Sequence, residues 1–213
     1  MRVVLFGPPG SGKGTQAASI VHELKIPHIS SGDMFRHAVA KGTKVGKEAE
    51  QHLKNGSLVP DAVVIKMISE RLSQADANDG FLLDGFPRTL NQAEALEKAL
   101  VKVGHEIDAV VVLQVPDEEI IKRTTGRRID PVTDEIYHIK FRPAPPEIVS
   151  RLIYRDDDRE EIVRKRLNKY HADTRQVMPY YEKRGLIRRI SGLGDLDVVK
   201  ARIFEALEIA APQ

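Results

Sequence analysis

Short apolar runs recur along this chain and are separated by segments with helical periodicity. Val3 to Phe6 is fully apolar, and similar runs lie at Phe81 to Leu83, Ala109 to Val115 and Leu186 to Ile190. Such runs are typical of parallel strands that are buried on both faces. A helical pattern follows the first run, from about Lys13 to Leu24. The alternation predicts an α/β fold with a parallel sheet and crossover helices.

Two stretches break this alternation and are predicted to be insertions. Ser30 to Val59 contains helix starts and glycines but no core strand. Gly126 to Asp158 contains β-like pieces within Ile136 to Phe141, a proline cluster and charged flanks, which favours a lid. The predicted division is therefore a core of residues 1–29, 60–125 and 159–213, with insertions at 30–59 and 126–158.

Composition limits the classes of function. A chain of 213 residues with 41% hydrophobic and 30% charged residues is typical of one globular domain with insertions. Its net charge of +2 argues against a nucleic-acid partner. The lack of cysteine excludes disulfides and thiolate metal sites, and no apolar stretch reaches the length of a membrane span. We expect a cytoplasmic monomer whose partners are small molecules.

A glycine-rich segment directly after the first strand predicts a phosphate site. Gly7 to Thr15 reads GPPGSGKGT and opens the first helix. Its glycines allow successive backbone N–H groups to surround a phosphate, and Lys13 can reach the β and γ oxygens. Gly14 occupies the usual hydroxyl position, so Thr15 becomes the candidate for the metal-side hydroxyl. The alternative is a strand-to-helix turn without a ligand, but the order strand, loop, lysine, helix favours phosphate.

The run at Phe81 ends in Asp84, which is the candidate for the Mg²⁺ shell of a bound nucleotide. An aspartate at a strand end can also simply form a turn. The segment Asp84 to Arg88 is not the DxxG of a GTPase switch, and Asn168 to His171 lacks the aspartate of a guanine-reading NKxD. A regulatory switch is therefore the weaker alternative.

Arginines gather at the glycine, proline and insertion boundaries. Guanidinium groups supply the positive charge that a transferring phosphoryl group requires, and an acceptor that is itself a phosphate needs no general base. Arg123 and Arg127 stand four apart and are predicted to share a helix face. The alternative for each arginine is a solvated surface ion pair. The arginines concerned are Arg36, Arg88, Arg123, Arg127, Arg155 and Arg166.

In these segments the chain resembles the adenylate kinase family, in its bacterial form with a long lid. The resemblance covers essentially the whole chain and its motifs are very specific. It rests on the segments 7–15 (GPPGSGKGT), 31–36 (SGDMFR), 81–88 (FLLDGFPR), 115–117 (VPD), 126–128 (GRR), 136–138 (IYH) and 155–158 (RDDD).

The resemblance implies the P-loop nucleoside monophosphate kinase fold, with a five-stranded parallel sheet in the order 2-3-1-4-5. The 30–59 insertion would cover AMP and the 126–158 insertion would close over ATP. The implied reaction is ATP + AMP = 2 ADP, with Mg²⁺ as cofactor. The nearest alternatives are nucleoside monophosphate kinases that act on UMP or CMP or use GTP.

The resemblance also implies individual site residues. Those around ATP are Gly10, Ser11, Gly12, Lys13, Gly14, Thr15, Arg127, Ile136, Tyr137 and Gly194. Those around AMP are Ser31, Arg36, Ser57, Leu58, Val59, Gly85, Phe86, Pro87, Arg88, Gln92, Arg155 and Arg166. The catalytic group is Lys13, Arg88, Arg123, Arg155 and Arg166, and Mg²⁺ would be held by Asp84, through water, and by Thr15.

Three positions call for a choice between interpretations. Gln92 follows Thr89 at the spacing of a capping box, in which it would bond back to the Thr89 backbone; the resemblance favours contact with adenine instead. Gly194 stands where relatives can carry lysine, so only a backbone contact is expected there. The lid offers Asp130, Thr133 and His138 but no obvious polar pair in its second half, so we expect no structural zinc.

Overall fold

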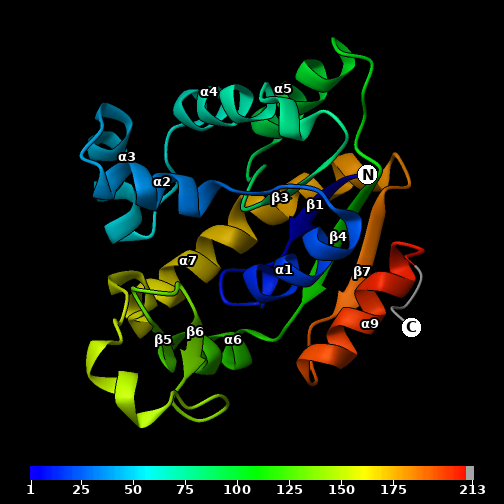
Figure 1. Cartoon of the computed structure of the whole chain (residues 1–213). Coiled ribbons are helices and arrows are strands. Elements are labelled where there is room, and N and C mark those ends of the chain that lie inside the picture. The colour runs from blue at the N-terminus through cyan, green and yellow to red at the C-terminus, as the bar shows by residue number, and fades with distance from the viewer. Residues whose placement is uncertain (210–213) are drawn as a thin grey trace.

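The computed structural model of the protein describes residues 1–209 and has a five-stranded parallel sheet at its centre (Figure 1). The strand order is β2-β3-β1-β4-β7, and all four neighbouring pairs are parallel. The strands are β1 (Arg2–Phe6), β2 (His28–Ser30), β3 (Phe81–Asp84), β4 (Ala109–Gln114) and β7 (Ile187–Ser191). With these strands numbered one to five along the chain, this is the predicted order.

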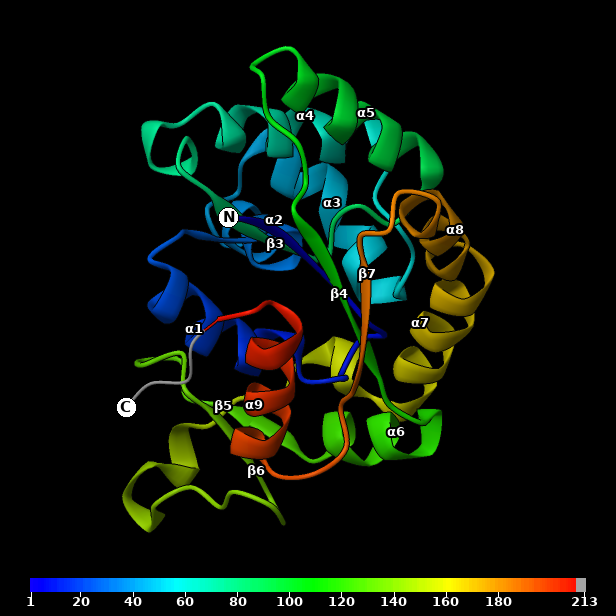
Figure 2. The same cartoon turned by 90° about the vertical axis from the view of Figure 1, so that its right-hand side faces the viewer.

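Helices cover both faces of the sheet (Figure 2). Alternate residues of β1 face opposite layers. Val3 and Leu5 pack with α1 (Lys13–Leu24) and α9 (Leu196–Ala206). Val4 and Phe6 belong to the cluster formed with α4 (Asp61–Leu72), α5 (Leu90–Val101) and α8 (Met178–Glu182). Each fully buried side chain of this size contributes about 1.5–3 kcal/mol relative to exposure. Burial on both faces explains why the strand is apolar throughout.

The strand β2 is the one that the apolar pattern did not reveal. It has three residues, and only Ile29 in its centre is buried, at 1% exposure. His28 and Ser30 flank it and pair with Leu82 and Asp84 of β3. The strand brings Ser30 beside Asp84, and the Ser30 hydroxyl accepts a bond from the Asp33 N–H at 3.2 Å, which confirms the predicted helix start.

The segment 30–59 is helical, as predicted, and the segment 126–158 contains a small sheet. The first holds α2 (Ser31–Ala40) and α3 (Lys44–Asn55). These helices approach so closely that a Cβ on Gly46 would lie 2.1 Å from the Ala38 carbonyl oxygen. The second holds the antiparallel strands β5 (Arg127–Ile129) and β6 (Ile136–His138).

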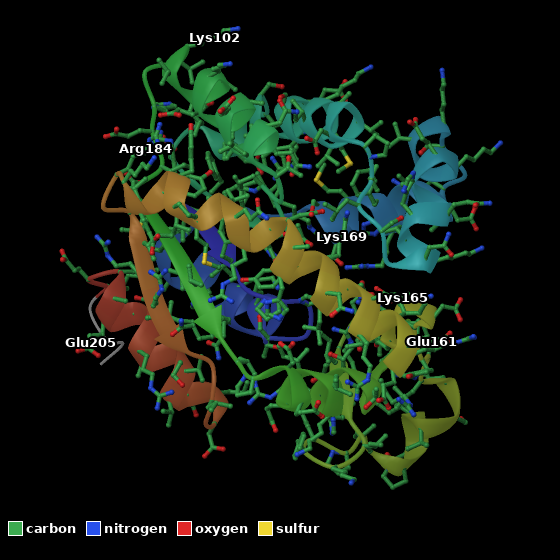
Figure 3. The ribbon with its side chains drawn as sticks, turned by 180° about the vertical axis from the view of Figure 1, so that it is seen from behind. Lys102, Glu161, Lys165, Lys169, Arg184 and Glu205 are labelled. Carbon is green, nitrogen blue, oxygen red and sulfur yellow. The ribbon has the colours of Figure 1, made fainter. Side chains whose placement is uncertain are left out.

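Two helices connect the core to the second insertion. The helix α6 (Asp117–Thr125) ends before Arg127, which begins β5, so the prediction that Arg123 and Arg127 share a helix face is wrong. Gly126 follows the last residue of the helix, and only glycine fits there, because a Cβ would lie 2.1 Å from the His138 ring. The helix α7 (Glu160–Ala172) crosses the back of the molecule, and Figure 3 shows Lys165 and Lys169 along it.

Four short 3₁₀ helices complete the assigned elements of residues 1–209, at Ala75–Ala77, Pro146–Arg151, Asp156–Asp158 and Thr174–Val177. Within that range no helix has the length and apolar character needed to cross a membrane.

Candidate functional site

A cleft of about 1830 Å³ lies where β1, β2, β3 and β7 end, between the segments 30–59 and 126–158. Ligands of open parallel sheets bind at this edge, because the connecting loops and helix N-termini meet there. All ten residues predicted around ATP line this cleft. So do Asp84 and the five predicted catalytic residues.

The loop between β1 and α1 has a backbone that depends on glycine. Gly10 and Gly12 have φ values of 82° and 96°, which side chains rarely adopt. A Cβ on Gly10 would also lie 2.0 Å from the Thr124 hydroxyl oxygen. The Ser11 hydroxyl is buried and has no hydrogen-bond partner within residues 1–209. A concave backbone with an unpaired hydroxyl is suited to an oxyanion.

Lys13 is the first residue of α1, and its side chain extends back to contact this loop. Its Nζ donates to the carbonyl oxygens of Gly7 and Pro8, at 2.8 and 2.9 Å. Burial lowers the pKa of Lys13 to about 8; Asp84 opposes this shift, whereas Arg88 and two other arginines add to it. An anionic ligand would reverse the shift, because it stabilises the charged ammonium.

The six arginines that were predicted from the boundaries all line the cleft, although they come from six different parts of the fold. Burial, followed by repulsion from Arg166, lowers the pKa of Arg88 to about 10. Burial and the nearby Arg36 and Arg127 likewise lower the pKa of Arg155 to about 10. These shifts identify a concentration of positive charge that bound phosphates would neutralise.

Acidic side chains hold part of this cluster. Asp158 is 1% exposed and accepts from both Nε and a terminal nitrogen of Arg127. Asp157 accepts from Arg166 at 2.7 Å. By contrast, the Arg88 guanidinium donates only through its Nε, to the Gly85 carbonyl oxygen at 2.7 Å, as far as the described part of the chain shows. Its two terminal nitrogens are therefore available to a ligand.

Asp84 and Thr15 offer hard oxygen donors in the lining of the cleft. Asp84 ends β3, and its nearest basic partner is the His28 Nε2 at 3.6 Å. Carboxylate and hydroxyl oxygens fit Mg²⁺, which is usually held by one or two side chains together with phosphate and water. Within residues 1–209 there is no cluster of three or more His, Asp or Glu that could hold a metal by itself.

The residues predicted around AMP divide into two sets. Eight line the cleft: Arg36, Ser57, Leu58, Gly85, Pro87, Arg88, Arg155 and Arg166. The other four are buried and are absent from its lining: Ser31, Val59, Phe86 and Gln92. Ser31 contacts a lining residue instead: its hydroxyl donates to the carbonyl oxygen of Gly85 at 2.7 Å.

Gln92 does not make the bond back to the Thr89 backbone that the capping-box alternative requires. Its Oε1 accepts from the Arg88 N–H at 2.8 Å, and its Nε2 donates to Asp61 at 2.7 Å. The other half of the cap is present, since the Thr89 hydroxyl accepts from the Gln92 N–H at 3.2 Å. Asp61 was missed from the sequence because it lies 31 positions away and belongs to no motif there.

The second half of the segment 126–158 contains the polar partner that the sequence did not reveal. Arg151 donates from Nε to Asp130 at 2.9 Å, and a terminal nitrogen donates to the other carboxylate oxygen. Asp130 is 1% exposed, and the hydrogen bond from Arg151 is the main reason why its pKa is lowered. The pair joins β5 to the 3₁₀ helix that precedes Leu152. His138 stabilises a turn instead, accepting from the Lys140 and Phe141 N–H groups.

We expect Arg151→Ala to loosen the lid selectively. The change leaves the Asp130 carboxylate buried without its charged donor, so hydrogen exchange of lid amides between residues 128 and 153 should accelerate by about tenfold. Mass spectrometry of exchange would measure this. Arg159→Ala is the matched control, because it removes an exposed pair with Asp156. Equal exchange in the two variants would contradict a stiffening role for Arg151.

The chain is similar to known proteins over nearly its full length. A sequence model of the family described as adenylate kinase matches residues 5–186. The adenylate kinase of Streptomyces griseus is 48% identical, with 98% of both chains covered. That of Fusobacterium nucleatum is 47% identical, covering 97% of this chain and 98% of the relative, and that of Thermodesulfovibrio yellowstonii is 45% identical, covering 98% and 99%.

Proposed function

Because this chain belongs to the adenylate kinase family, we propose that it transfers the γ-phosphoryl group of Mg-ATP to AMP and releases two ADP. The protein is thus an ATP:AMP phosphotransferase, and the reaction is reversible. Its nucleotide partners would be ATP, AMP and ADP.

The observation that carries the proposal is a phosphate-binding loop that faces six arginines across one cleft. A phosphate acceptor already carries an ionised oxygen, so the reaction needs positive charge and alignment rather than a general base. Lys13 and the loop N–H groups would hold the β and γ phosphates of ATP. Arg88 would hold the acceptor phosphate, since its terminal nitrogens are free of protein partners within residues 1–209.

We propose further that Arg123, Arg155 and Arg166 bridge the two phosphate groups. Arg123 already donates to the Gly192 carbonyl oxygen at 2.9 Å, which orients its guanidinium at the end of β7. The Arg155 guanidinium makes no hydrogen bond to another residue of the described range, and burial lowers its pKa. Guanidinium groups in this state stabilise the charge of a phosphoryl group in transit.

The proposed metal site consists of Asp84, acting through water, and Thr15. A bound Mg²⁺ would neutralise charge on the β and γ phosphates. Asp84 suits this role because it ends β3 inside the cleft, 3.6 Å from His28 and near Lys13. We expect that chelation of Mg²⁺ abolishes activity.

We propose that the chain divides into a core of residues 1–29, 60–125 and 159–213, an AMP-binding segment at 30–59 and a lid at 126–158. Both insertions contribute to the cleft, through Arg36 and Leu58 on one side and Arg127 and Tyr137 on the other. Their closure would exclude water, which otherwise competes as phosphoryl acceptor. Monomeric state and cytoplasmic location remain predictions.

The test is formation of ADP from Mg-ATP, with and without AMP. Rapid ADP formation that depends on AMP supports the proposal, and ADP that appears no faster with AMP contradicts it. Comparison of AMP, CMP, UMP and GMP as acceptors, and of ATP with GTP as donor, separates this enzyme from related kinases. Preference for a pyrimidine acceptor would overturn the assignment of AMP.

A further inference from the structure

The Gln92 amide is held at both ends by groups whose hydrogen-bonding character cannot change. Its Oε1 accepts from the backbone N–H of Arg88 at 2.8 Å, and its Nε2 donates to Asp61 Oδ1 at 2.7 Å. The side chain is 1% exposed, so solvent offers no substitute partners. A backbone N–H can only donate, and an ionised carboxylate can only accept. Turning the amide over would place two donors together and two acceptors together.

Asp61 is kept ionised and in place by two further donors. Its Oδ2 accepts from the Thr89 hydroxyl at 2.8 Å and from Asn91 Nδ2 at 3.0 Å. Burial acts to raise the pKa of Asp61, but the bonds from Asn91, Thr89 and Gln92 together hold it below its ordinary value. As the first residue of α4, Asp61 thereby connects that helix to the start of α5.

The amide orientation leaves a defined pattern for a ligand. One hydrogen remains on Nε2 and one acceptor position remains on Oε1. Gln92 is itself absent from the lining of the cleft, but it bonds to the backbone N–H of Arg88, which lines the cleft, and to Asp61, three positions after Leu58, which also lines it. Adenine presents an N6–H donor beside the N1 acceptor, which matches this pattern. Hypoxanthine presents the opposite arrangement, with O6 as acceptor and N1–H as donor.

We propose that Asp61 is a positioning residue that sets selectivity for AMP over IMP, by fixing the Gln92 amide in the orientation that pairs with adenine. The inference rests on the proposed function and on the contact between Gln92 and the acceptor base that the resemblance implies. Asp61 acts through Gln92 and does not itself touch the nucleotide. Selectivity of this kind arises because the wrong base leaves buried polar groups unpaired.

Asp61→Asn is the direct test, because it keeps the shape of the side chain and introduces a donor. The measured quantity is kcat/KM for AMP and for IMP, each with saturating Mg-ATP. We expect kcat/KM for AMP to fall by about tenfold or more, kcat/KM for IMP to fall less, and KM for ATP to stay unchanged. Asp61→Ala, which removes the acceptor without adding a donor, should lower the AMP-to-IMP ratio in the same direction.

Asp117→Asn is the matched control. Asp117 is also the first residue of a helix that follows a proline, but it faces His171 instead of Gln92. Because the AMP-to-IMP ratio is measured within one preparation, it does not depend on how much of a variant is folded. A ratio in both Asp61 variants equal to that of wild type, or an equal fall in Asp117→Asn, overturns the inference. Failure of the proposed function would appear instead in wild type, as ADP formation independent of AMP.

Discussion

Replacing Arg88 with alanine is expected to lower kcat by about a thousandfold or more, with little change in melting temperature. The Arg88 guanidinium makes one hydrogen bond within residues 1–209, through Nε to Gly85. Repulsion from Arg166 contributes to its lowered pKa, so removal of its charge relieves a strain in the unliganded protein. The positive charge is needed only when the phosphoryl group is transferred. Single-turnover rates and thermal unfolding would measure the two effects.

Arg71→Ala is the control for a structural arginine. Arg71 pairs with both oxygens of Asp76, at 2.8 and 2.7 Å, and lies outside the lining of the cleft. Its loss should affect stability more than the rate of the folded enzyme. A large fall in the melting temperature of Arg88→Ala, with activity per folded molecule preserved, would contradict the role assigned to Arg88.

Lys13→Met is expected to lower kcat/KM for ATP by about a hundredfold or more. The variant keeps the length of the side chain but removes the charge that would face the β and γ phosphates. It also removes the two bonds to the Gly7 and Pro8 carbonyl oxygens, so some loosening of the loop is expected. Lys66→Met, on the exposed face of α4, is the matched control. Steady-state rates at varied ATP would measure the loss.

The pH dependence of wild type gives an independent check on Lys13. Its pKa is lowered to about 8, so the ammonium is charged below this pH and loses its proton above it. KM for ATP should therefore rise as the pH increases through about 8 in wild type, and this rise should be absent from Lys13→Met. An identical pH profile in both proteins would show that the charge of Lys13 does not contribute to binding.

Most of the fold could be predicted because its signals are local. The strands β1, β3 and β4 are buried on both faces and so are apolar over several residues. In β7 only Ile190 is buried, and Arg188 and Arg189 interrupt the apolar pattern. The strand β2 gave no such apolar signal, because it has only three residues and one buried side chain, which is too short for a recognisable hydrophobic pattern. Its existence followed from the resemblance, and its position followed from pairing with β3.

The backbone of the glycine-rich loop was predictable for a similar reason. The loop from Gly7 to Gly12 carries its geometry in its own residues, because positive φ values and close approach both demand glycine at Gly10. The arginines could be recognised by type but not by arrangement. Arg127 begins a strand instead of ending a helix, and only its pairing with Asp158 fixes its direction.

The sequence by itself determined the alternation of strands and helices, the phosphate-binding loop and the family. These depend on short-range patterns, in which burial and backbone conformation act on neighbouring residues. The tertiary structure alone decided which charged groups meet. Asp61 reaches Gln92 across 31 positions, and Arg151 reaches Asp130 across 21. No local rule selects such partners, because a buried carboxylate accepts whichever donors the packing of distant elements brings to it.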